Sequence, residues 1–121
     1  TAILDWEMTH LADVHEDLAW ILFPGFAAAG EDGVRRVCGL ATREEFLQRY
    51  EQASGITPDP QRLAYYEILN IFKLAVLSAA TNVRAAADRQ THLDIMMNFS
   101  TGMGYLSMSL LMAKLREQGV M

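Results

Sequence analysis

Positive charge and cysteine are what this 121-residue sequence has least of. Its first 34 residues contain seven Asp or Glu residues and no Lys or Arg, and the formal net charge of the chain is −5. An acidic chain repels a phosphate backbone, so we expect no nucleic-acid partner. The lone cysteine, Cys38, excludes an internal disulfide and is typical of a reducing compartment. We therefore expect a cytoplasmic protein.

The sequence also lacks a basic segment followed by an apolar run at its start, so no signal peptide is expected. Residues 95–113 are uncharged, and their length of 19 residues would suit a membrane span. Two glycines and several hydroxyl side chains interrupt this stretch, so we expect no membrane partner. With 51% hydrophobic and 21% charged residues, 1–121 is predicted to be one globular domain or part of one.

Two short helices are predicted in the first half of the chain. The first spans Asp13 to Phe23, with Asp13 as its cap and Pro24-Gly25 after its end. Residues 24–41 are rich in Gly and Ala and are expected to be irregular, with one helical turn near residues 32–37. Thr42 and Glu45 then form a capping-box signature, which predicts a helix that runs to about residue 53.

Two long helices are predicted in the second half. Asp59 followed by Pro60 indicates a helix start, and the helical pattern continues to about residue 87. A last helix is expected over 91–118, antiparallel to the one before it. The apolar residues expected to form the core-facing stripe of the first long helix are Leu69, Phe72, Val76, Ala79 or Ala80, and Val83.

The chain opens on an apolar segment that carries two acids. Residues 1–7 are predicted to form a strand, in which successive side chains alternate between faces. Asp5 and Glu7 would then point the same way, and carboxylate oxygens are the ligands that Mg²⁺ prefers. The alternative is a strand end whose acids merely face solvent.

Three motifs in this opening region carry a family resemblance: 4–7 (Leu-Asp-Trp-Glu), 11–13 (Leu-Ala-Asp) and 17–20 (Asp-Leu-Ala-Trp). They are similar to the second half of the active site of the aminoglycoside phosphotransferase and choline kinase-like family. That family includes the acyl-CoA-dehydrogenase-linked phosphotransferases. Ala12 and Val14 depart from the Gly and Pro that are usual there. Further similarity at residues 50–55, 62–66 and 70–76 extends the resemblance over most of 2–80.

The resemblance implies the C-terminal helical part of a protein-kinase-like C-lobe, mainly α with one short N-terminal strand. The intact protein would transfer the ATP γ-phosphoryl group to a hydroxyl of a small molecule. Asp5 would bind the Mg²⁺ that bridges the nucleotide phosphates, and Glu7 would be a second ligand. Asp13 and Asp17 would support the site, Asp17 as a buried acid. The helices behind the strand would form the acceptor-site wall, with Tyr65, Tyr66, Asn70 and Lys73 as candidates.

The nucleotide-binding lobe and the catalytic base of such a kinase would lie upstream of residue 1 in the family order. The chain alone is therefore expected to be inactive and to bind neither Mg²⁺ nor ATP tightly. The alternative function is a non-catalytic helical module that self-associates or binds a protein partner. Apolar surface left uncovered by an absent upstream half would favour a homodimer.

The chain has three histidines, and two of them, His10 and His15, could suggest a metal site. His10 and His15 are five residues apart, whereas a spacing of four places two histidines on one helix face. The spacing is therefore against a zinc site, and His92 at a helix start is expected to be a surface residue.

Overall fold

The computed structural model describes residues 2, 9–88 and 94–120. The predicted strand and its acids, Asp5 and Glu7, lie outside the described residues. The described part is mainly helical, as expected. Its elements are α1 (Val14–Ile21), a 3₁₀ turn (Pro24–Phe26), β1 (Ala27–Ala29), β2 (Arg35–Val37), α2 (Arg43–Ser54), α3 (Pro60–Asp88) and α4 (Asp94–Glu117).

Three of the four predicted helix starts are confirmed by their capping contacts. The Asp13 side chain accepts from the backbone N–H of His15 and caps α1. Thr42 and Glu45 exchange both hydrogen bonds of a capping box at α2, which ends at Gly55 with φ 71°. Asp59 Oδ1 accepts from the backbone N–H groups of Gln61 at 2.8 Å and Arg62 at 3.0 Å, so the first turn of α3 is satisfied.

The prediction for residues 24–41 is wrong. Instead of an irregular segment with a helical turn, β1 and β2 form an antiparallel hairpin in which Ala27 lies opposite Val37. Three consecutive alanines give no period-two signal, so the strand pattern was hidden. The hairpin is held by its own turn and by Arg35, whose guanidinium donates to the carbonyls of Pro24 and Ala27.

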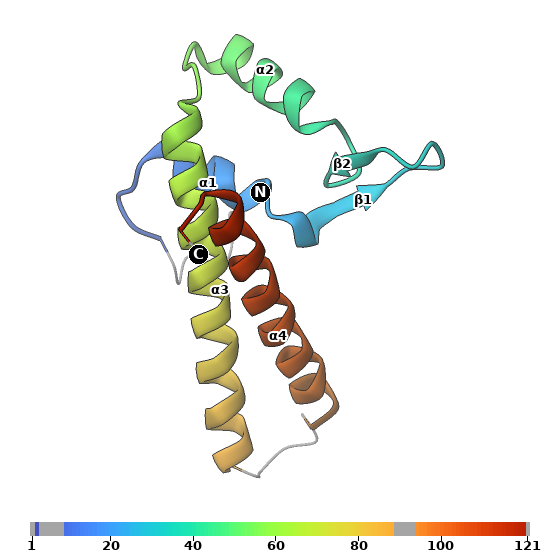
Figure 1. The fold of residues 1–121 in the computed structure, drawn as a ribbon, viewed down its shortest axis with the longest axis vertical. Coiled ribbons are helices and arrows are strands. Elements are labelled where there is room, and N and C mark those ends of the chain that lie inside the picture. Colours follow the sequence, from blue (N-terminus) through green and yellow to red (C-terminus); the bar gives the residue numbers. More distant parts are fainter. Residues whose placement is uncertain (1, 3–8, 89–93, 121) are drawn as a thin grey trace.

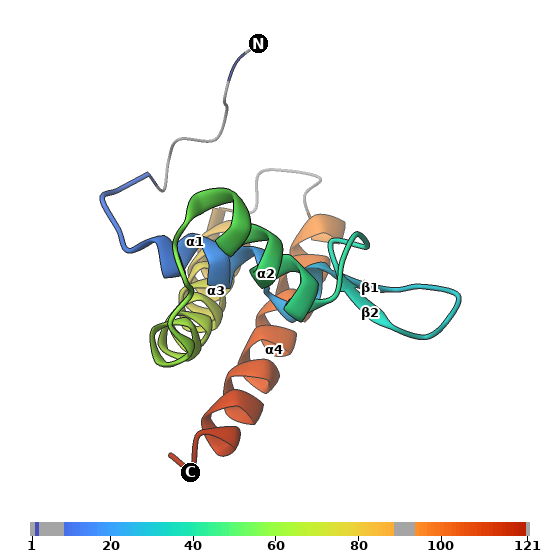
Figure 2. The same cartoon turned by 90° about the horizontal axis from the view of Figure 1, so that it is seen from above.

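The long helices α3 and α4 form an antiparallel pair, and α1 lies beside the first half of α3 (Figure 1). Seen from above, the β1–β2 hairpin projects away from the helices (Figure 2). One buried cluster joins α1 to α3 through Leu18, Ala19, Leu22 and Leu63. A second cluster joins α3 to α4 through Phe23, Ile71 and Leu111.

Two residues of the predicted core stripe of α3 face outward. Phe72 and Val76 are 52% and 49% exposed, so their assignment to the core is wrong within this chain. Over residues 60–80 of α3, the buried residues are Leu63, Glu67, Asn70, Ile71, Ala75 and Ser78. Two neighbours, α1 and α4, pack on this more polar side. The hydrophobic pattern alone therefore misplaces the contact face.

One stretch of the described residues, Pro60–Ala80, is long and apolar enough to cross a membrane by length and composition. A third of its most apolar window is buried inside the protein. The core helix of a globular protein has the same properties, so this observation is weak.

Candidate functional site

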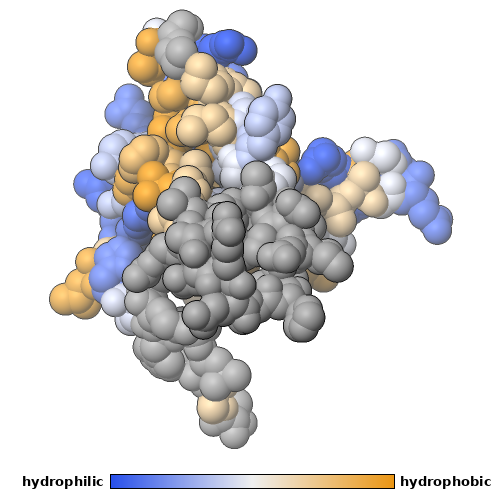
Figure 3. Space-filling model, turned by 90° about the horizontal axis from the view of Figure 1, so that it is seen from below, coloured by the Kyte–Doolittle hydropathy of each residue, from blue (hydrophilic) through white to orange (hydrophobic). Residues whose placement is uncertain are grey.

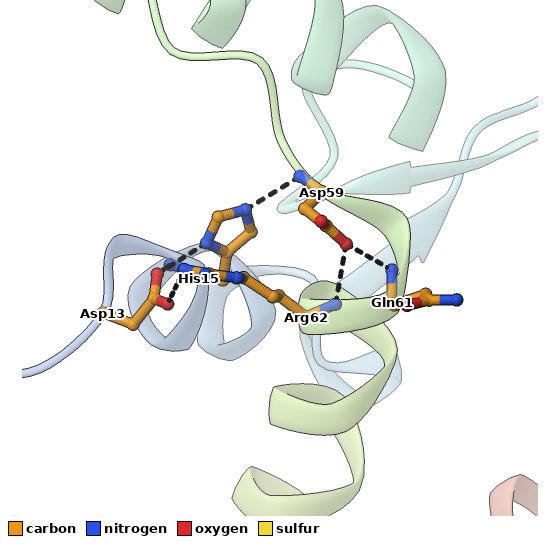
Figure 4. A network of polar contacts seen from close by, with 5 residues as sticks. All are labelled: Asp13, His15, Asp59, Gln61 and Arg62. Atoms are coloured by element: carbon orange, nitrogen blue, oxygen red, sulfur yellow. Dashed lines mark hydrogen bonds and ion pairs between the residues drawn. The ribbon is translucent and has the colours of Figure 1, made fainter.

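The candidate site lies where the segment that carries the predicted metal ligands enters α1. At this point a network of polar contacts fastens the start of α1 to the start of α3 (Figure 4). Arg62 Nη1 donates to Asp13 Oδ2 at 2.9 Å, and the backbone N–H of Asp59 donates to His15 Nε2 at 2.8 Å. Both contacts join residues more than forty positions apart in the sequence.

These contacts fix the tautomer of His15. Because Nε2 accepts a hydrogen bond from a backbone N–H, it carries no proton. Nδ1 therefore carries the proton and donates it to Asp13 Oδ1 at 2.5 Å. The ring is buried and both nitrogens are engaged. His15 is thus a structural link between α1 and α3 and has no nitrogen left for a metal ion, in agreement with the spacing argument.

Asp13 is the electrostatic centre of this network. Its pKa is lowered from 3.8 to about 2, first by the backbone N–H of His15, then by the His15 ring, with Arg62 contributing less. The carboxylate is therefore charged throughout the physiological range. The expectation that Asp13 caps α1 is confirmed by these contacts.

One turn further on, Glu16 makes a second set of contacts with α3. Lys73 donates to Glu16 Oε1, and His10 Nε2 lies 3.2 Å from Oε2. The pKa of Glu16 is lowered, mainly by the Lys73 hydrogen bond. The side chain of Asn70, 3% exposed, donates to the Glu16 backbone carbonyl at 2.9 Å. Glu16 is thus tied to α3 by both its side chain and its backbone.

The four residues predicted to line the acceptor site do not share one surface. Asn70 and Lys73 hold α1. Tyr66 packs against the α1–α3 cluster, and partial burial, with Asp13 and Glu16 nearby, raises the pKa of its hydroxyl. Tyr65 contacts the Tyr66 ring edge-on but is 60% exposed on the outer side of α3. Three of the four candidates, Asn70, Lys73 and Tyr66, are therefore engaged in contacts between α1 and α3.

Asp17 is exposed in the first turn of α1. The burial that the resemblance implied for it is not seen in this chain. An acid in the first turn of a helix is favoured by the helix dipole, which accounts for Asp17 without any further partner.

Glu67 is a buried carboxylate on the inner side of α3, outside the network of Figure 4. It is 7% exposed, with Arg43 Nη1 of α2 2.5 Å from Oε1 and Lys114 Nζ of α4 3.3 Å from Oε2. The Arg43 contact lacks hydrogen-bond geometry, so Oε1 is paired by charge alone. A cavity of about 50 Å³ adjoins these side chains. Glu67 thereby ties α2, α3 and α4 together.

The acids of the candidate site are already paired with cations. Among residues 9–88 and 94–120, no group of three or more His, Cys, Asp or Glu side chains is placed to hold a metal ion. Asp13 and Glu16 are engaged by Arg62 and Lys73 and are not available as ligands.

The network around His15 was not predicted, although its parts carry local signals. Asp13 lies two residues before His15, a spacing at which a capping side chain can also contact a neighbouring side chain. Arg62 follows the capping residue Asp59 by less than one helical turn. Their mutual contact depends on how α1 docks on α3, and local spacing does not encode that docking.

Comparison of the chain with protein-family models, with curated proteins and with solved structures finds no match in any of the three.

Proposed function

We propose that this chain forms the C-terminal helical part of an ATP-dependent phosphotransferase that acts on hydroxyl groups of small molecules. The proposal starts from the motif resemblance over residues 4–20. The observation that carries it in the structure is the double attachment of residues 13–16 to α3, through Arg62, Asp59, Asn70 and Lys73.

This attachment suits the function because a metal-bearing segment must be held rigidly against the rest of the fold. Asp13 and Glu16 are paired by cations of α3 and so do not compete for the metal ion. Asp5 and Glu7 would hold Mg²⁺, which would neutralise the charge of the nucleotide phosphates during transfer. Hard carboxylate donors suit that ion.

Fewer residues are available for the acceptor site than the resemblance implied. Asn70 and Lys73 hold α1, and Tyr66 packs against the α1–α3 cluster. Of the four candidates only Tyr65 is largely exposed, and the proposal does not depend on it.

The test uses the polypeptide encoded by the complete reading frame, assayed for ADP release with Mg²⁺-ATP and a panel of hydroxylated metabolites. Asp5→Asn should lower turnover by several orders of magnitude without unfolding the protein, because metal-assisted charge neutralisation supplies most of the catalysis. Glu31→Gln, which removes one charge from an exposed hairpin turn, is the matched control and should leave turnover unchanged.

Normal turnover by Asp5→Asn would contradict the proposal. So would a reading frame that contains no upstream His-x-Asp followed by Asn five residues on, because a kinase of this class needs that catalytic loop.

A further inference from the structure

The outer side of α3 carries an apolar stripe that no described element covers. Tyr65, Leu69, Phe72 and Val76 follow one another at intervals of four, three and four residues. Tyr65, Phe72 and Val76 are each about half exposed or more. Figure 3 shows apolar residues gathered in a band on this molecule, with hydrophilic residues on either side. We call these four residues the outer stripe.

The outer stripe borders a groove between α3 and α4. The groove has a volume of about 270 Å³. Its lining residues are all apolar or aromatic: Tyr65, Ile68, Leu69, Phe72, Leu111 and Leu115. Such a groove is shaped to receive apolar side chains, as the holes between neighbouring helices do in coiled coils.

The charges beside the outer stripe exclude several kinds of partner. The flanking cations Arg62 and Lys73 are already paired with Asp13 and Glu16. Nucleic acid and anionic lipid would need such cations, and the chain has a net charge of −5. The occupant should therefore present an apolar protein surface.

The spacing of the outer stripe matches a second copy of itself. Intervals of four, three and four are those of the a and d core positions of a coiled coil. In an antiparallel coiled coil, an a residue of one helix lies opposite a d residue of the other. A two-fold axis between residues 70 and 71 would place Tyr65 opposite Val76 and Leu69 opposite Phe72. Each layer then combines a large ring with a smaller aliphatic side chain, and no like charges meet across the axis.

We propose that two copies of this chain associate through the outer stripe, with α3 packed antiparallel against α3 of the second copy. This association goes beyond the proposed phosphotransfer and does not depend on it. Three residues of the stripe expected from the sequence, Leu69, Phe72 and Val76, are then buried between chains instead of within one.

The first test is sedimentation equilibrium of the 121-residue chain. A reversible dimer is expected at about 100 μM, the range of a modest two-helix contact. Phe72→Glu should raise the dimer dissociation constant at least about tenfold, because it places a charge in the centre of the contact. Leu40→Glu makes a matched change at an exposed position outside α3 and should leave the constant unchanged.

The second test checks the register in a Cys38→Ser background. Tyr65→Cys combined with Val76→Cys should give disulfide-linked dimers on mild oxidation, whereas Tyr65→Cys alone should not. Cross-linking by the single variant would indicate a parallel pairing and overturn the proposal. This test does not require a folded Phe72→Glu variant.

Three further results would overturn the proposal: a monomer at about 100 μM, a dimer that is unaffected by Phe72→Glu in protein of native helicity, and a monomer that binds zwitterionic phosphatidylcholine vesicles through α3. The last result would assign the stripe to a lipid surface.

Discussion

Over residues 60–80, the two sides of α3 differ in how they are covered within the chain. The inner side buries the polar residues Glu67, Asn70 and Ser78 beside the apolar Leu63, Ile71 and Ala75, and hydrogen bonds and ion pairs tie it to neighbouring elements. The outer side exposes Tyr65, Phe72 and Val76. Buried polar groups must be paired, and this pairing makes the inner side specific. An apolar side without a cover within the chain points to burial against something else.

Substitution of Glu67, on the inner side of α3, is expected to cause the largest loss of stability. Glu67→Ala would leave Arg43 and Lys114 without their shared carboxylate and should lower the free energy of unfolding by about 3–5 kcal/mol, since breaking a buried ion pair leaves unpaired charge. Urea denaturation measures this loss. The exposed Glu44→Ala is the control and should stay within about 0.5 kcal/mol of wild type. Equal losses in the two variants would show that Glu67 holds nothing together.

Asn70 allows a direct comparison of the two sides of α3, because its stability loss can be measured against that of a substitution on the outer side. Asn70→Ala should cost about 1–3 kcal/mol, since the Glu16 carbonyl loses its buried donor. Phe72→Ala removes a larger apolar side chain but should cost less in dilute, monomeric protein because Phe72 is half exposed. Thermal unfolding at low protein concentration tests both, and a larger loss for Phe72→Ala would reverse the assignment of the two sides.

Thr42, the capping residue of α2, gives a reference value for the stability contributed by one local contact outside α3. Thr42→Ala removes the side-chain half of the α2 capping box and should cost about 1 kcal/mol. Thr42→Ser keeps the hydroxyl and should cost much less. Denaturant unfolding separates the two, and identical stabilities would mean that the capping box contributes nothing.

The smallest expected effect is the dependence of stability on acid pH that Asp13 contributes. Its pKa is lowered to about 2 in the folded chain, so its contribution is present above the ordinary value of 3.8 and is lost as the pH falls from there through the folded value. Unfolding curves at pH 7 and in the acid range should therefore show a loss in wild type that is smaller in Asp13→Asn. The same acid dependence in both proteins would place the effect elsewhere.

Much of the helical layout could be predicted from the sequence. The capping signals at Asp13, Thr42 and Asp59 are local, and each was found where expected. The β1–β2 hairpin could not be predicted, because Ala27–Ala29 lack alternation and the turn is fixed by side-chain contacts such as Arg36 with Asp32.

The candidate site was harder to predict than the fold. His15 meets Asp59 across 44 residues, and local periodicity carries no information on such a contact. The orientation of α3 was also misjudged, because its apolar residues give the stronger periodic signal although they lie on the exposed side. A hydrophobic pattern predicts that a face is buried, but it does not tell whether the face is buried within the chain or against a second chain.

The central functional claim is that Asp5 and Glu7 form a cation site at the entrance to α1. The most direct test is a titration of the ¹⁵N-labelled chain with Mn²⁺, which prefers the same oxygen ligands as Mg²⁺ and broadens nearby amide signals. The claim predicts weak binding, with broadening concentrated around residues 5–7 that disappears in Asp5→Asn. Broadening centred on the acid pairs at 31–32 or 44–45, and unchanged by Asp5→Asn, would contradict it.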